Sequence, residues 1–197
     1  MAILGIDCSS NNGPVDWALA SGRGVQFAFY RKNLCLLQDR MFKENSWTLR
    51  TSSIKPCLYT VWDPKLPMEA QVQAFLSGLI PTDWHRIAVD VERPHAWGVN
   101  SPRVLNALTY VLHSIANWHG RRPYIYTARA VWNRYYSTGD QFAEFPLWVA
   151  NYQRANPVLP AGWTDYAIWQ YSADGNRLGA YYGVKSMSID LDTAKAL

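Results

Sequence analysis

Two carboxylates stand two positions apart in the run RIAVDVER, residues 86–93, which is otherwise rich in apolar residues. Such a run is typical of a buried β-strand, where charge is costly. Because side chains alternate along a strand, Asp90 and Glu92 share one face while Val89 and Val91 share the other. Neighbouring acids in a buried site raise each other's pKa, so one of them can stay protonated near neutral pH. A protonated acid beside an ionised one is the pairing that cleaves glycosidic bonds.

The same arrangement recurs in two other strand-like runs. Asp7 ends the run AILGID on the face opposite to its large apolar side chains, and Asp190 has the same relation to the run MSIDL, residues 187–191. We place all these acids at the carboxyl ends of their strands, which is where barrels of parallel strands carry their active sites. The sequence therefore predicts that Asp7, Asp90, Glu92 and Asp190 converge on one mouth of a barrel.

Two other uses of such a cluster remain open at this point. Four oxygen ligands could hold Mg²⁺ or Ca²⁺ in a metal-dependent hydrolase, although no histidine joins the predicted strand ends, which disfavours zinc or iron. A barrel that binds glycan without cutting it would use the ten Trp and twelve Tyr of the chain, but would not need the acid at Glu92. We expect neither a metal nor a cofactor.

The acids need a scaffold, and eight β-rich runs can supply it. These runs span residues 2–7, 25–30, 57–62, 86–91, 123–127, 146–151, 166–171 and 187–191. Helical patterns lie between the first six, over residues 14–22, 42–50, 68–79, 101–120 and 128–136, whereas loops join the last three. Alternating strands and helices favour a parallel sheet, and eight strands favour closure. The predicted fold is one α/β domain over residues 1–197, a TIM-like (β/α)5(β)3 barrel.

Composition narrows the class of protein. Only 17% of the residues are charged, the net charge is +4, and no dense Lys/Arg run suggests a nucleic-acid partner. No stretch approaches the ~20 apolar residues of a membrane span, and the first residues lack the pattern of a secretory signal. Cys8, Cys35 and Cys57 have neither metal-site nor disulfide-framework spacing, which favours reduced, buried thiols. We expect a monomer made in the cytoplasm, without membrane insertion.

Taken in order, these runs resemble the glycoside hydrolase family 25 lysozymes, N-acetylmuramidases found in bacteria and phages. GIDCSSNNGPVDW is similar to the opening of the family, FAFYRKN and QDRMFKENSW to its second strand and the segment after it, and AVDVE to its Asp-x-Glu signature. PYIYT, LWVANY, AIWQYS and SIDLDTA resemble its later motifs. The chain departs from the family pattern at Cys8, where Val is usual, at Thr60, where His is frequent, and at Asp192, where Asn is common.

The resemblance implies a function for the acids. It implies hydrolysis of the β-1,4 bond between N-acetylmuramic acid and N-acetylglucosamine in bacterial peptidoglycan, with Glu92 as general acid. Asp90 would stabilise positive charge or orient the 2-acetamido group, and Asp7 and Asp190 would complete an acidic floor. The implied groove residues, for which barrel packing is the alternative, are Tyr59, Tyr126, Trp148 and Gln170. An endolysin of this kind without a secretory signal would be released by a phage holin or carried in a virion to act on the cell wall.

Overall fold

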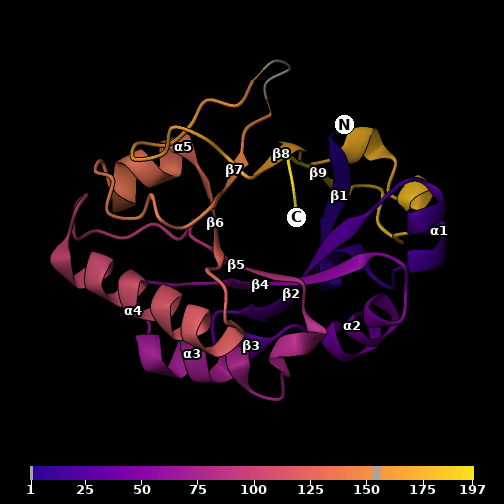
Figure 1. The fold of residues 1–197 in the computed structure, drawn as a ribbon, viewed down its shortest axis with the longest axis horizontal. Coiled ribbons are helices and arrows are strands. Elements are labelled where there is room, and N and C mark those ends of the chain that lie inside the picture. The colour runs from indigo at the N-terminus through magenta and orange to yellow at the C-terminus, as the bar shows by residue number, and fades with distance from the viewer. Residues whose placement is uncertain (1, 153–155) are drawn as a thin grey trace.

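The computed structural model describes residues 2–152 and 156–197, and the strands of this part form one sheet that closes into a barrel (Figure 1). β1 pairs with both β2 and β9, which closes the ring. A short strand outside the ring, β3 (Leu37–Gln38), was not predicted and forms a hairpin with the end of β2. The barrel strands are β1 (Ile3–Cys8), β2 (Phe27–Leu34), β4 (Lys55–Val61), β5 (Arg86–Asp90), β6 (Tyr124–Ala128), β7 (Leu147–Ala150), β8 (Ile168–Ser172) and β9 (Asp190–Ala194). The predicted (β/α)5(β)3 barrel is confirmed.

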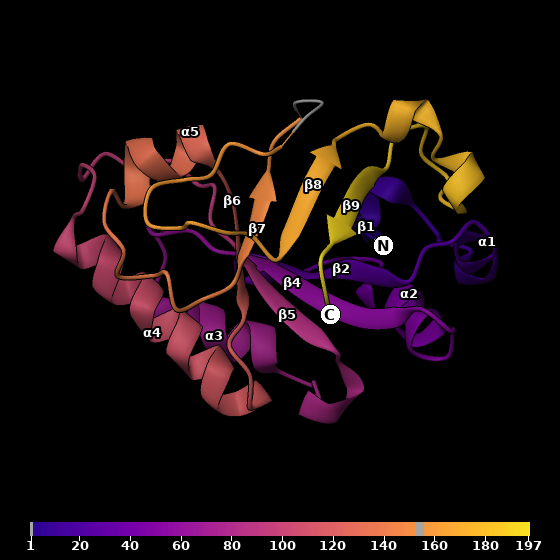
Figure 2. The same cartoon turned by 45° about the horizontal axis from the view of Figure 1, so that its top comes forward.

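Helices cover the outside of the barrel between the early strands (Figures 1 and 2). They are α1 (Trp17–Gly22), α2 (Phe42–Arg50), α3 (Met68–Leu76), α4 (Pro102–His119) and α5 (Arg129–Val131), which continues as a π-helical turn over Trp132–Tyr136. α3 and α4 pack against each other. After β7 the described chain has no further α-helix, only 3-10 turns at Gly175–Arg177 and Ala180–Tyr182. Among the described residues, none of the helices combines the length and apolar character that a bilayer span needs.

Strand alternation divides the apolar side chains into two cores. One lies between strands and helices and includes Ile6, Val89 and Val91, as the alternation predicts. The other fills the barrel and contains mostly rings and small side chains: Phe27, Phe29, Tyr124, Trp148, Ile168, Cys57, Ala88 and Ala194. Such bulky rings leave no room for a side chain on β1 at Gly5, where a Cβ atom would lie 2.1 Å from the ring of Phe27. The three cysteines are buried and free, as predicted.

The last strand corrects the sequence prediction in position and direction. It covers Asp190–Ala194 instead of residues 187–191, and it runs antiparallel to β1 and β8, whereas the other ring pairings are parallel. Asp190 is therefore the first residue of its strand, not near its end. Because the strand is reversed, its first residue lies at the same mouth as the carboxyl ends of the parallel strands, directly opposite Asp7.

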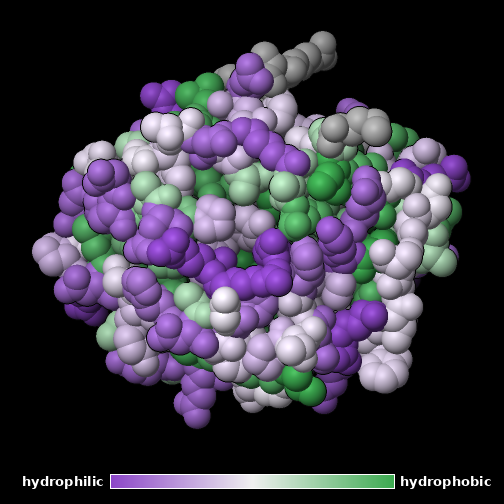
Figure 3. Space-filling model, viewed as in Figure 1, coloured by the Kyte–Doolittle hydropathy of each residue, from purple (hydrophilic) through white to green (hydrophobic). Residues whose placement is uncertain are grey.

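On the face shown in Figure 3, hydrophilic side chains are widespread and apolar ones lie scattered between them. Large exposed apolar side chains include Leu37 on β3, Trp47 on α2 and Met187 in the loop before β9. The site is better located from its buried polar groups.

Candidate active site

The structure brings the four predicted acids to one mouth of the barrel. Asp7 faces Asp190 across the β1–β9 pair, and Asp90 ends β5 opposite Tyr126 of β6. Burial, and then the nearby charge of Asp7, raise the pKa of Asp190 to about 9, and Glu92 also contributes to this shift. The charge of Glu92 raises the pKa of both Asp90 and Asp190, which indicates that Glu92 lies on the same side of the barrel as these acids.

Asp90 and Glu92 form a coupled pair. Burial raises the pKa of Asp90 well above its usual value, and the charge of Glu92 raises it further. Burial also raises the pKa of Glu92. The guanidinium groups of Arg93 and Arg31 act in the opposite direction on Asp90, because they stabilise its charged form. Both pKa values are thus raised, which favours a protonated donor beside an ionised carboxylate.

Gln170 is the centre of a hydrogen-bond network beneath this mouth. Its Nε2 donates to Asp7 Oδ2 at 2.7 Å, and its Oε1 accepts from the hydroxyls of Tyr126 at 2.8 Å and Tyr152 at 2.9 Å. Gln170 on β8 is only 2% exposed, and its bond to Asp7 is buried. The network fixes which way the amide faces and links Asp7 through Gln170 to two tyrosines. Tyr152, 56% exposed, was not predicted as a site residue.

We expect Gln170→Leu to lower the free energy of unfolding by about 2–4 kcal/mol, because Asp7 and two tyrosine hydroxyls lose a buried partner. Urea denaturation followed by tryptophan fluorescence measures the change. The matched control is Gln73→Leu on the exposed face of α3, which we expect to stay within about 0.5 kcal/mol of the parent. Equal effects of the two substitutions would contradict the role given to the network.

Arg31 is a positive group that the sequence analysis missed. It follows Phe27 and Phe29 on the inner face of β2, and its guanidinium contacts Asp39 Oδ2 at 2.8 Å through NH2 and 3.0 Å through Nε. Asp39 is itself buried and accepts from the backbone N–H of Ser10. The cation is therefore held in place close to Asp90. The same strand alternation that located the acids could have found it.

The predicted aromatic residues have different surroundings. Tyr59 and Tyr126 are half-buried inside the barrel. Burial is the main cause that raises the pKa of both hydroxyls, and the charges of the nearby acids raise it further. Trp148 is only 1% exposed, and its ring packs on Phe29 with centroids 4.5 Å apart. Because the ring is so deeply buried, it offers little area to a sugar. This favours a supporting role for Trp148 below the groove. Its Nε1 donates to Asp192 Oδ1 at 2.8 Å.

Asp192 is a further acid that the sequence analysis did not place in the cluster. It lies two residues after Asp190 on β9 and faces the barrel interior, where it is fully buried. Alternation along β9 was the signal that could have found it. Within the described residues, no group of three or more His, Cys, Asp or Glu side chains is arranged to hold a metal ion.

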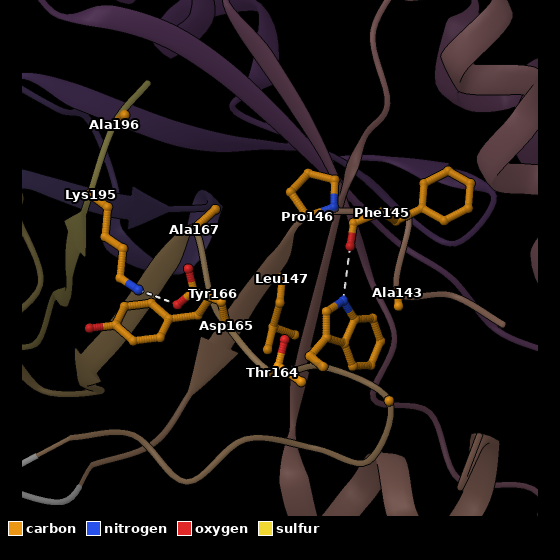
Figure 4. Close-up of a pocket in the computed structure, with 12 residues that line it drawn as sticks. Ala143, Phe145, Pro146, Leu147, Thr164, Asp165, Tyr166, Ala167, Lys195 and Ala196 are labelled. Carbon is orange, nitrogen blue, oxygen red and sulfur yellow. Dashed lines mark hydrogen bonds and ion pairs between the residues drawn. The ribbon is translucent and has the colours of Figure 1, made fainter. Parts of the chain in front are cut away.

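A hollow of about 400 Å³ at the opposite end of the barrel is a separate feature (Figure 4). It lies beside the starts of β7 and β8 and the end of β9, and none of the clustered acids lines it. Two of its polar groups have partners: Trp163 Nε1 donates to the Phe145 carbonyl at 2.9 Å, and Lys195 pairs with Asp165. The hollow is therefore separate from the cluster of acids.

Comparison with known proteins identifies the family to which this chain belongs. Residues 6–180 match Glycosyl hydrolases family 25. Lysozyme M1 of Streptomyces globisporus is 26% identical over 199 residues, and the match covers 92% of this chain and 65% of that protein. The chain thus spans slightly less than two thirds of the length of this relative.

Two solved structures share the fold. A family 25 glycosyl hydrolase from Bacillus anthracis superposes with a TM-score of 0.83 at 20% identity, covering 99% of this chain and 89% of its own. The bacterial lysozyme from Streptomyces coelicolor gives a TM-score of 0.85 at 21% identity, covering 100% of this chain and 93% of its own. With the family match extending over most of the sequence, the chain belongs to family 25 of the glycosyl hydrolases.

Proposed function

We propose that this protein is a muramidase, which hydrolyses the β-1,4 bond between N-acetylmuramic acid and N-acetylglucosamine in bacterial peptidoglycan. The observation that carries the proposal is the meeting of Asp7, Asp90, Glu92 and Asp190 at one mouth, where burial raises the pKa of each acid. Membership of a glycosidase family and similarity to a protein named lysozyme support this reaction class.

Glu92 is the general acid in this proposal. It lies beyond the end of β5, at the open side of the pair, whereas Arg31 and Arg93 favour the negative charge on Asp90. Burial raises the pKa of Asp90 more than that of Glu92 in the free site, and the two arginines oppose that shift. In the proposed reaction the proton is on Glu92 when a sugar is bound and passes to the glycosidic oxygen as the bond breaks. Asp90 then stabilises the positive charge that develops on the sugar ring, or orients its 2-acetamido group.

Asp7 and Asp190 form the floor below the reacting sugar. Gln170 holds Asp7 in place, and the hydroxyls of Tyr126 and Tyr152 close the network on the side of the groove. Tyr59, Tyr126 and Gln170 are the groove residues closest to the acids, with Trp148 supporting them from inside the barrel. The substrate is cell-wall peptidoglycan, which the protein would reach by holin release or as part of a virion.

Mass analysis of digested peptidoglycan tests the proposal. We expect fragments with N-acetylmuramic acid at the new reducing ends, and the same yield of fragments with and without EDTA. New reducing ends of N-acetylglucosamine, or free peptides, would contradict the bond assigned. Activity that EDTA abolishes and Mg²⁺ restores would instead show a metal-dependent hydrolase, and binding of peptidoglycan without any fragments would show a glycan-binding barrel.

A further inference from the structure

Asp192 is a buried acid to which the proposed reaction assigns no role. It lies inside the barrel at 0% exposure, opposite Gly5 of β1 and Gln170 of β8. Its Oδ1 accepts from Trp148 Nε1 at 2.8 Å, but Oδ2 has no N–H or O–H partner within the described residues. A buried carboxylate oxygen without a donor is strongly unfavourable. A proton shared with a second carboxyl group would satisfy Oδ2.

The carboxyl group in hydrogen-bond contact with Asp192 is that of Asp7, which is also in hydrogen-bond contact with Asp190 on its other side. Two ionised carboxylates cannot hydrogen-bond to each other, because neither carries a donor. Asp7 Oδ2 already accepts from Gln170 Nε2, as Asp192 Oδ1 accepts from Trp148. We infer that Asp7 and Asp192 share one proton in a carboxyl–carboxylate hydrogen bond, and that Asp192 is a positioning residue which fixes Asp7 below the reacting sugar.

The surroundings of the pair favour retention of this proton. Burial raises the pKa of both acids well above the usual value, and the charges of neighbouring acids add to this. Hydrogen bonds from Gln170 to Asp7 and from Trp148 to Asp192 lower the pKa of each acid, but burial outweighs them, and no cation is among the groups that shift either pKa. The titratable groups that in turn respond to the charge of either acid are Cys8, Tyr59, Tyr126, Tyr152, Tyr171 and Asp190. A second negative charge on the pair would thus meet only neutral or acidic groups.

Asn at position 192 would reproduce the hydrogen bonds of this arrangement without a titrating group. Its Oδ1 can accept from Trp148, and its Nδ2 can donate permanently to Asp7 in place of the shared proton. Ala would remove both contacts. The two substitutions, D192N and D192A, therefore separate the hydrogen bond from the acid that supplies it.

The first experiment counts protons released on unfolding, by urea denaturation between pH 5 and 8. In this range the folded pair keeps its proton while both acids are ionised in the unfolded chain, so stability falls as pH rises. We expect D192N to release one proton fewer than the parent, a roughly tenfold smaller change in the unfolding constant per pH unit. D140N, at an exposed position, should equal the parent. An unchanged count in D192N would overturn the shared proton.

The second experiment measures turnover on peptidoglycan and rests on the proposed function. We expect D192A to lower turnover at least about tenfold through displacement of Asp7, and D192N to restore it to within about threefold of the parent. Equal loss in both variants would overturn the positioning role. If the parent enzyme showed no muramidase activity, only the proposed function would be wrong. The proton count needs no substrate, so it tests the shared proton independently.

Discussion

Glu92→Gln is expected to lower the turnover number on peptidoglycan about 10³-fold, the middle of the range for loss of a general acid. Gln has the shape of Glu but no proton to give, so the leaving oxygen must depart unprotonated. A 10³-fold loss corresponds to about 4 kcal/mol of transition-state stabilisation. KM should change by no more than about twofold, because the contact with Glu92 matters in the transition state and not in the bound substrate. Initial rates on solubilised glycan chains give both constants.

An activated substrate distinguishes proton donation from a general loss of the site. An aryl glycoside with a good leaving group releases a stable phenolate anion, so its leaving oxygen needs no protonation. We expect E92Q to hydrolyse it within about tenfold of the parent rate, while D90N, which removes the stabilising charge, loses about 10²-fold or more on both substrates.

The matched control for E92Q is Glu69→Gln, at an exposed position of α3 far along the chain from the acids. This variant should show the parent rate on both substrates. If E92Q is impaired equally on the glycan and on the aryl glycoside, Glu92 is not the proton donor. If E92Q clears bacterial cells as fast as the parent does, the whole assignment of the pair is wrong.

Gly5→Ala is expected to lower the free energy of unfolding by about 3 kcal/mol. A Cβ atom at this position would lie 2.1–2.4 Å from three atoms of the Phe27 ring. That ring cannot withdraw, because it is fully buried and packed edge-on against Phe29 at 6.1 Å. The strand or the ring must therefore shift, and the floor below Asp7 shifts with it. Thermal and urea unfolding of the two proteins measure the cost.

A second substitution tests the stated cause. Phe27→Leu shortens the side chain, so G5A combined with F27L should cost less than the sum of the two single changes, by about 1–2 kcal/mol. Gly22→Ala at the end of α1 is the control, because nothing lies within 4 Å of its added Cβ and we expect a change of less than about 1 kcal/mol. Strict additivity of G5A and F27L would refute the clash.

The part of the site that could be predicted from sequence is the part that depends on alternation. Alternation placed Asp7, Asp90 and Asp190 inside the barrel whatever the direction of each strand. Alternation could not predict the strand direction. The connection before β9 contains no α-helix, and either a parallel or an antiparallel return satisfies the same period of two. The sequence thus predicted the correct face of the strand for Asp190 but the wrong end of the strand.

Other site groups could not be predicted because side-chain hydrogen bonds decide them. Nothing in the run YAIWQY specifies that the amide of Gln170 turns toward Asp7. Arg31 was accessible to the same reasoning as the acids, but a search for clustered carboxylates ignores a cation. Asp192 was noted only as a departure from a family motif, although its position on β9 places it inside the barrel.

The reversed last strand also determines where the chain can be tethered. Because β9 runs down from the acidic mouth, Ala194 pairs with Ile3 at the far rim of the barrel, and the two ends of the chain emerge near each other there (Figure 2). A bead, surface or reporter attached through either end would therefore face away from the cleft. Immobilised in this way, the enzyme would present its open mouth to a suspension of cells.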